Sequence, residues 1–231
     1  MIEIHCADAT KFMQAIAPNS VDCIITDPAY SSLEKHRAKG TTTRLKQSTA
    51  SSNAWFPVVD NEYFSAFFAA CHAALKPGGH FYFFCDPETS YVVLPDAIDV
   101  GFLWGNRLIW DKLAIGMGYH YRRQYEDILF LKKHGPRRGL ASMSISDVLR
   151  VRRIKSKDAY PTEKPVELLN ILIGQSTEPE QLIVDPFVGS GATAEAAVTS
   201  SRRFLGCDIE PRAVALANAR LDKFRSDKVA E

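Results

Sequence analysis

The feature that most constrains the fold of this chain is an apolar run, a glycine turn and a helix-forming stretch in direct succession near its end. The apolar residues 182–184 lead into Asp185-Pro-Phe-Val-Gly-Ser-Gly191, and an alanine-rich stretch follows. Gly189 and Gly191 let the backbone approach a ligand closely, and the start of a helix favours negative charge. A strand, turn and helix of this kind are typical of an α/β domain with a parallel sheet.

Hydrophobic patterning along the rest of the chain alternates between the period of a strand and that of a helix. It predicts strands at 2–6, 21–25, 80–85, 107–111, 127–132, 182–184 and 203–207, and helices at 11–17, 62–75, 91–100, 165–173, 192–200 and 211–225. This alternation indicates a mostly parallel sheet flanked by helices. We expect one domain spanning residues 1–231, because an apolar fraction of 46% is enough for a single core.

Neither membrane nor metal chemistry is indicated by the sequence. No apolar run approaches the roughly 20 residues needed to cross a bilayer, and the first residues lack the pattern of a secretory signal. The five cysteines include no Cys-x-x-Cys pair. We therefore expect a cytoplasmic protein without disulfides or a metal site.

Positive charge is concentrated in two segments, although the net charge of the chain is only +1. One segment, 31–59, is rich in Ser and Thr, and we expect it to be a mobile loop. The other, about 132–159, has weak periodicity and is predicted to form a small basic appendage for recognition of DNA. Two basic segments on an otherwise acidic chain favour a polyanionic partner over a merely solvated surface.

A second carboxylate makes the glycine turn more informative. Asp208 ends the next predicted strand, where a carboxylate can accept hydrogen bonds from both hydroxyls of a ribose, while Asp185 is placed to bind a cationic amine. The glycine pattern is one glycine short of the dinucleotide fingerprint, so S-adenosylmethionine fits better than NAD. Taken alone, a single G-x-G is also compatible with a purely structural turn.

The apolar run 21–25 is followed by Asp27-Pro-Ala-Tyr30, which suits chemistry on the exocyclic amine of a nucleobase, adenine or cytosine. The lone pair of such an amine is delocalised into the base, and two acceptors for its N–H groups favour a pyramidal nitrogen. Asp27 supplies one acceptor and the Pro28 carbonyl the other, and Tyr30 can stack on a base. Positive charge develops on that nitrogen during methyl transfer, so a fixed carboxylate stabilises the transition state most. The simpler interpretation is a turn that ends a strand.

Four segments resemble the motifs of amino-group DNA methyltransferases. Asp185-Pro-Phe-Val-Gly-Ser-Gly-Ala-Thr193 is similar to their cofactor motif, and Asp27-Pro-Ala-Tyr30 is similar to their catalytic D/N/S-P-P-Y/F motif. Tyr160-Pro-Thr-Glu-Lys-Pro165 resembles their H-P-T-x-K-P element, and Arg122-Arg-Gln-Tyr-Glu-Asp-Ile-Leu129 resembles their Y-R-x-x-x-E-x-I-L strand region. A catalytic motif that precedes the cofactor motif is the order of the β class. The resemblance covers nearly the whole chain.

The resemblance implies a Rossmann-like, S-adenosylmethionine-dependent methyltransferase fold with circularly permuted motif order. It implies that the methionine side of the cofactor is lined by Asp185, Phe187, Gly189, Ser190, Gly191 and Thr193. Asp208 would hold the ribose, Asp8 would contact the adenine, and Thr162, Lys164 and Pro165 would close the methionine end. Asp27, Pro28 and Tyr30 would be catalytic, with Asp27 also touching the cofactor.

The same resemblance implies double-stranded DNA as partner, with the target base flipped out of the duplex. The residues expected to contact DNA are basic: Lys35, Arg37, Lys39, Arg44, Lys46, Arg122, Arg123, Arg137, Arg138, Arg152 and Arg153. Whether they read bases or bind phosphates is left open by the sequence. A homodimer and a cognate restriction endonuclease also stay open as partners.

An aspartate at the start of the catalytic motif is more typical of adenine-N6 enzymes, which makes adenine-N6 the leading interpretation. Cytosine-N4 methylation, RNA adenine-N6 methylation and a catalytically silent nucleic-acid-binding module are the alternatives. Ala29 stands where the family has a second proline, which frees one torsion of the catalytic loop and restores one N–H group.

Overall fold

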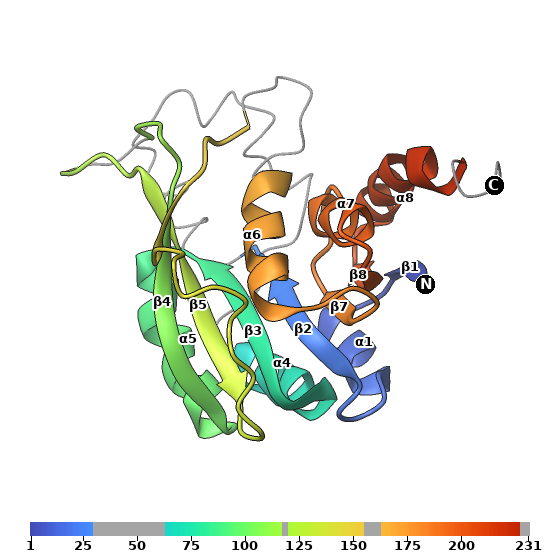
Figure 1. Cartoon of the computed structure of the whole chain (residues 1–231), viewed down its shortest axis with the longest axis horizontal. Helices are drawn as coiled ribbons and strands as arrows, with labels where there is room; N and C mark the ends of the chain where they lie inside the picture. The colour runs from blue at the N-terminus through green and yellow to red at the C-terminus, as the bar shows by residue number, and fades with distance from the viewer. Residues whose placement is uncertain (30–62, 117–119, 155–162, 227–231) are drawn as a thin grey trace.

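An eight-stranded sheet forms the centre of the computed structural model, which describes residues 1–29, 63–116, 120–154 and 163–226 (Figure 1). Its spatial order is β1 (Ile2–Cys6), β8 (Arg203–Asp208), β7 (Leu182–Asp185), β2 (Val21–Thr26), β3 (Leu75–Cys85), β5 (Tyr125–Lys133), β4 (Phe102–Asp111) and β6 (Val148–Arg150). Only β5 among them runs antiparallel to its neighbours. The predicted α/β fold with a mostly parallel sheet is confirmed.

Helices cover both faces of the sheet and give it two cores. On one face lie α1 (Ala9–Ala15), α4 (Tyr63–Ala74) and α5 (Pro87–Asp99), and on the other lie α6 (Val166–Ser176), α7 (Ala192–Thr199) and α8 (Pro211–Ser226). Side chains alternate between the faces along each strand, so Ile24 belongs to the first core and Ile25 to the second. Because both faces are covered, β2 is an unbroken buried run.

The structure differs from the sequence expectations mainly in the lengths of strands and in the basic segment. β3 and β4 are longer than predicted, and α5 begins at Pro87 with Asp86 as its N-cap. The described part of the basic segment contributes the end of β5 and the edge strand β6, which was not predicted. The predicted mobile loop 31–59 lies outside the described residues. Among those that are described, no helix has the length and apolar character needed to cross a membrane.

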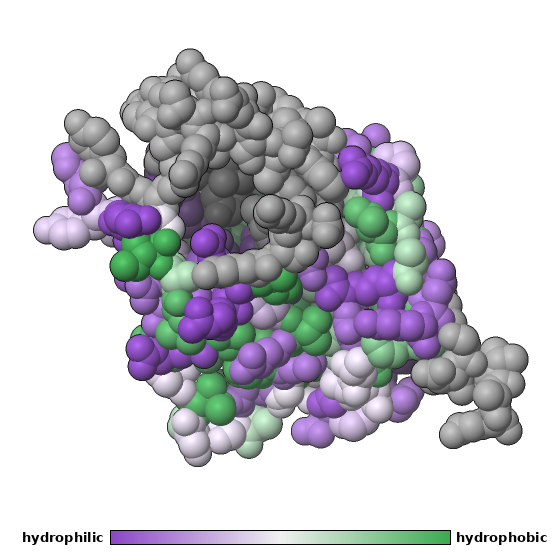
Figure 2. Space-filling model, turned by 90° about the horizontal axis from the view of Figure 1, so that it is seen from above, coloured by the Kyte–Doolittle hydropathy of each residue, from purple (hydrophilic) through white to green (hydrophobic). Residues whose placement is uncertain are grey.

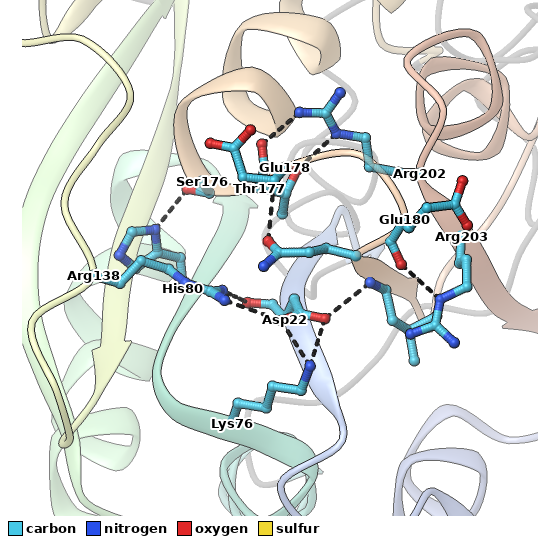
Figure 3. A network of polar contacts seen from close by, with 12 residues as sticks. Asp22, Lys76, His80, Arg138, Ser176, Thr177, Glu178, Glu180, Arg202 and Arg203 are labelled. Carbon is cyan, nitrogen blue, oxygen red and sulfur yellow. Dashed lines mark hydrogen bonds and ion pairs between the residues drawn. The ribbon is translucent and has the colours of Figure 1, made fainter.

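A buried carboxylate ties the strands together at the amino-terminal edge of the sheet (Figure 3). Asp22, 1% exposed, accepts hydrogen bonds from Lys76 at 2.9 Å, from Arg138 at 3.0 Å and from the Leu182 backbone N–H at 3.0 Å. Burial opposes ionisation of Asp22, but these donors together lower its pKa. The network fixes β2, β3 and β7 to the segment that follows β5.

Arg138 was expected to bind DNA, and the structure gives it this other role. Its guanidinium bonds both the side chain and the backbone carbonyl of Asp22, near the start of β2. Asp27 follows the opposite end of the same strand. Arg138 thus has a structural role at the edge away from Asp27, and its contact with DNA stays a prediction.

Candidate active site

Four acidic side chains lie at the carboxyl ends of neighbouring parallel strands. Asp8 follows β1, Asp208 ends β8, Asp185 ends β7 and Asp27 follows β2, and these strands are adjacent in the order β1-β8-β7-β2. The edge lies at the top of Figure 1, where the arrow of β2 points. Ligands of open α/β sheets bind at this edge. The structure therefore brings together the acids that the sequence singled out.

The glycine turn between β7 and α7 has the conformation that its sequence predicts. Gly189 and Gly191 have φ angles of 51° and 81°, in the left-handed region that suits glycine. A Cβ atom on Gly191 would lie 2.9 Å from the Cα of Ala217 on α8. The turn therefore needs glycine both for its backbone conformation and for the close approach of α8.

Asp208 fastens this turn to the next strand. Its Oδ2 accepts a hydrogen bond from the Gly189 N–H at 2.9 Å, and its Oδ1 accepts one from the Glu210 N–H at 3.0 Å. The side chain is buried, and burial raises its pKa although both amides oppose the shift. Each oxygen of a carboxylate has two lone pairs, so these bonds leave Asp208 able to accept further hydrogen bonds.

Asp185 is the most deeply buried of these four aspartates, with 3% of its surface exposed. Its Oδ1 accepts hydrogen bonds from the Thr26 hydroxyl at 2.9 Å and from the Phe187 N–H at 3.0 Å. Burial raises the pKa of Asp185 to about 7, against the effect of hydrogen bonds from Thr193, Phe187 and Thr26. A cationic group bound beside this carboxyl would favour its ionised form.

Asp8 has contacts with two helices. Its Oδ1 accepts a hydrogen bond from the Lys11 N–H at 3.0 Å and caps α1, while its Oδ2 accepts one from the Tyr63 hydroxyl at 3.0 Å. These bonds fix the start of α1 and connect it to α4. The preceding residue, Ala7, donates its N–H to the Asp208 carbonyl at 3.0 Å, so Asp8 follows the end of β1 that is paired with the end of β8.

The ammonium of Lys164 lies between two carboxylates. It contacts Oδ2 of Asp27 closely and Oε2 of Glu126 at 3.3 Å. The lysine is 7% exposed, and the rings of Phe84 and Trp110 lie 5.3 and 5.9 Å from its nitrogen. The family resemblance assigns Lys164 to the methionine end of the cofactor, and in the structure its ammonium is paired with Asp27.

A second lysine extends this arrangement into a row of alternating charges. Lys112 donates to Oε1 of Glu126 at 2.5 Å and lies 5.4 Å from the Trp110 ring. The row is Asp27, Lys164, Glu126 and Lys112. Sequence reasoning did not propose a role for Glu126 or Lys112. The signal that was present for Glu126 is its match to the glutamate of the Y-R-x-x-x-E-x-I-L pattern. The antiparallel β5 places this residue at the carboxyl edge of the other strands.

The row controls the ionisation of Asp27. Burial raises the pKa of Asp27 to about 6, Lys164 opposes the rise and the charge of Glu126 adds to it. Burial disfavours the charged form of Lys164, but the two carboxylates outweigh it and raise the lysine pKa. For Glu126, burial is outweighed by Lys164 and Lys112, which lower its pKa. Asp27 is therefore the acid of the row that takes up a proton most readily.

The predicted DNA-contacting arginines are divided between the two edges. Arg122 and Arg123 lie between β4 and β5, where Arg123 bonds Asp86 at 3.0 Å. Arg152 and Arg153 follow β6 and are exposed at the same carboxyl edge. Arg137 is exposed beside Arg138, close to the amino-terminal edge. Tyr30, Thr162 and the basic residues 35–46 lie outside the described residues.

Figure 2 looks onto the carboxyl edge and shows hydrophilic residues interleaved with hydrophobic ones over the described surface. Exposed basic and aromatic side chains are found here, including Tyr121 at 93% exposure. Within the residues that the structure describes, no group of three or more His, Cys, Asp or Glu side chains is placed to hold a metal ion.

Comparison with known proteins identifies the family. The model of the N6/N4 DNA methylase family matches residues 21–219, which is most of the chain. The chain belongs to the N6/N4 DNA methylase family. It is accordingly a DNA methyltransferase, and the matched region includes Asp27, Lys164, the glycine turn and Asp208.

Two curated relatives extend over nearly the whole chain of this DNA methylase. The type II methyltransferase M.HpaI of Haemophilus parainfluenzae is 25% identical over 94% of this chain and 73% of its own length. The DNA adenine methyltransferase YhdJ of Escherichia coli K12 is 26% identical over 95% of this chain and 82% of its own length.

Solved structures share the fold of this DNA methylase. The PvuII DNA methyltransferase, specific for cytosine N4, has a TM-score of 0.76 at 18% identity and covers 95% of this chain and 86% of its own. TTHA0409 of Thermus thermophilus, a putative DNA modification methylase complexed with S-adenosyl-L-methionine, has a TM-score of 0.72 at 21% identity. The match covers 96% of this chain and 95% of TTHA0409. The fold is therefore that of S-adenosylmethionine-dependent DNA methyltransferases.

The charge row predicts opposite pH shifts for two variants. With the Asp27 carboxylate as the predicted acceptor for the amine, the single-turnover rate of methyl transfer at saturating cofactor should fall as the pH drops through about 6. Lys164→Met removes the cation that lowers the Asp27 pKa and should move this acid limb to higher pH by about one unit or more. Glu126→Gln removes the charge that raises that pKa and should move the limb to lower pH.

A pH profile from about pH 5 to pH 9 measures these shifts. Lys76→Met is the matched control, because Lys76 pairs with Asp22 at the opposite edge of the sheet and should leave the limb in place. Shifts of the same sign in the Lys164 and Glu126 variants would contradict the electrostatic role given to the row.

Proposed function

We propose that this DNA methylase transfers a methyl group from S-adenosylmethionine to the exocyclic N6 of an adenine flipped out of double-stranded DNA. The observation that carries the proposal is the position of Asp27 directly after β2, which is the neighbour of β7 and its glycine turn in the sheet. The acceptor for the amine and the site for the methyl donor then lie at adjacent strand ends. Thr26 bonds Asp185 across these two strands at 2.9 Å and supports that juxtaposition.

The residues of the glycine turn fit the proposed methyl donor. Asp208 accepts two backbone N–H groups and keeps lone pairs for the ribose hydroxyls, and Asp185 is a buried carboxyl suited to the methionine ammonium. Phe187, Ser190 and Thr193 complete the methionine side, and Asp8 is assigned to the adenine. When bound, S-adenosylmethionine supplies a methyl group on a sulfonium.

Asp27 provides the stabilisation that methyl transfer to an amine needs. Lys164 holds Oδ2 of Asp27, and we assign the other oxygen, Oδ1, to one N–H of the target base. The Pro28 carbonyl accepts the other N–H, and Tyr30 stacks on the base. As positive charge develops on the nitrogen, the carboxylate gains a favourable interaction that is weaker in the ground state. The proton that leaves the nitrogen is taken up by Asp27, whose pKa of about 6 is close to neutrality.

Adenine is favoured over cytosine by the aspartate that opens the catalytic motif, and the name of the Escherichia coli relative as an adenine methyltransferase points the same way. Cytosine N4 is the second candidate, because the PvuII enzyme with the same fold is specific for it. The name of the Haemophilus relative as a type II methyltransferase supports a role beside a cognate restriction endonuclease. Formation of a homodimer stays a prediction.

Nucleoside mass spectrometry distinguishes the candidate substrates. Duplex DNA and RNA of the same mixed sequence are incubated with the protein and isotopically labelled S-adenosylmethionine, digested and analysed. We expect labelled N6-methyl-2′-deoxyadenosine from the DNA and no labelled nucleoside from the RNA. Label in N4-methyl-2′-deoxycytidine would identify cytosine as the target base in place of adenine. Label in nucleosides from the RNA would identify RNA as the substrate in place of DNA. An absence of label in every product, from protein shown to bind the cofactor, would contradict methyl transfer itself.

The division of the arginines between two edges predicts which of them bind DNA. Arg152 and Arg153 are exposed at the edge that carries Asp27, so replacing both by Ala should weaken DNA binding and reduce the slope of log K against log salt by about two. Arg137→Ala is the matched control, since Arg137 is exposed near the opposite edge and should leave the slope unchanged. Equal slopes for the double variant and the control would show that DNA approaches another surface.

A further inference from the structure

Arg220, on the helix α8, contacts three segments that are distant in the sequence. Its Nη1 donates to Oε1 of Glu163 at 2.8 Å and lies 3.5 Å from the carbonyl and 3.4 Å from the hydroxyl of Ser190. Its Nε donates to Glu195 on α7. One guanidinium therefore joins the segment before α6, the glycine turn and α7.

The position of Glu163 gives these contacts a consequence for the site. Glu163 directly precedes Lys164, and the two side chains are held by opposite parts of the molecule. Glu163 is paired with Arg220 beside the glycine turn, and Lys164 is paired with Asp27 after β2. Pro165 follows as the N-cap of α6, with the φ of −62° that its ring imposes. The segment 163–165 thus bridges the cofactor turn and the catalytic carboxylate.

The ion pairs of Arg220 are shielded enough to position this bridge. The side chains of Arg220, Glu163 and Glu195 are 21%, 12% and 16% exposed. Charge-assisted hydrogen bonds in such surroundings are stronger than those between fully exposed charges. The planar guanidinium also fixes the relative direction of its acceptors, which a lysine ammonium does not.

We propose that Arg220 is a positioning residue that locks the segment 163–165 against the Ser190 turn and thereby sets the cofactor site and Asp27 in one geometry. It acts through Glu163 and Ser190 and touches no reacting atom. The proposal rests on the proposed function for its effect on methyl transfer. Its effect on cofactor binding is independent of which base is methylated.

The alternative is that Arg220 only attaches α8 to α7, and the chain contains a matched control for that role. Lys223, on the same helix, bonds the same Glu195 at 3.0 Å, and its side chain is 57% exposed. A change of Lys223 to Met therefore removes a tie between α8 and α7 while the contacts of Arg220 with Glu163 and Ser190 remain.

A double-mutant cycle tests the proposal. Arg220→Met, Glu163→Gln, the double variant and Lys223→Met are compared by calorimetry for the affinity of S-adenosylmethionine and by single-turnover methyl transfer at saturating cofactor. We expect Arg220→Met and Glu163→Gln each to weaken cofactor binding and slow transfer about 10-fold. The double variant should be about as impaired as Arg220→Met alone, because the bond that Glu163→Gln affects is already lost in Arg220→Met. Lys223→Met should match the wild type in both measurements.

Two results would overturn the proposal. One is an Arg220→Met variant that binds and transfers as Lys223→Met does, and the other is a double variant whose losses are the full product of the single losses. If Arg220→Met fails to fold, Glu163→Gln and Arg220→Lys carry the test, with Arg220→Lys expected between the wild type and Glu163→Gln. Calorimetry without DNA measures only cofactor affinity. It therefore tests the role of Arg220 even if the proposed methylation of adenine is wrong.

Discussion

The ammonium of Lys164 lies between the carboxylates of Asp27 and Glu126, and the site depends on this contact because it keeps a half-buried acid ionisable. Without a cation, burial beside Glu126 would favour the protonated form of Asp27. A protonated carboxyl stabilises the positive charge that develops on the nitrogen less than a carboxylate does. The aromatic rings of Phe84 and Trp110 cover Lys164 and keep water from weakening the interaction. The charge row thus connects the architecture of the sheet with the proposed chemistry.

The parallel sheet makes such a row possible. Parallel strands bring their carboxyl ends to one edge, and β1, β8, β7 and β2 each deliver an aspartate there. The antiparallel β5 has the opposite direction, so its first residues add Glu126 to the same edge. The opposite edge is closed by Asp22 with Lys76 and Arg138, and it holds the strands in register while the other edge remains available for ligands. The charges around Asp22 and those around Asp27 thus lie at opposite ends of the strands.

Local sequence patterns predicted the fold and the strand ends at which the acids of the candidate site lie. Apolar periodicity located the strands, and the glycines with Asp208 predicted a turn whose two positive φ angles and amide bonds the structure contains. Contacts between distant residues were not predictable in this way. Asp27 and Lys164 are 137 residues apart, and Asp22 and Arg138 are 116 apart, so no local pattern indicates either pair. The edge strand β6 has three residues, too few for a periodic signal, and only its pairing with β4 defines it.

Replacement of Asp27 by alanine tests the central claim most directly. In the proposed mechanism, Asp27 lies where charge develops on the amine nitrogen, and the main cofactor contacts come from other strand ends. Single-turnover transfer by Asp27→Ala should therefore fall by about 100-fold to 1,000-fold or more, while the affinity for S-adenosylmethionine measured by calorimetry stays close to that of the wild type. Transfer at the wild-type rate in a folded variant that binds the cofactor would contradict the account.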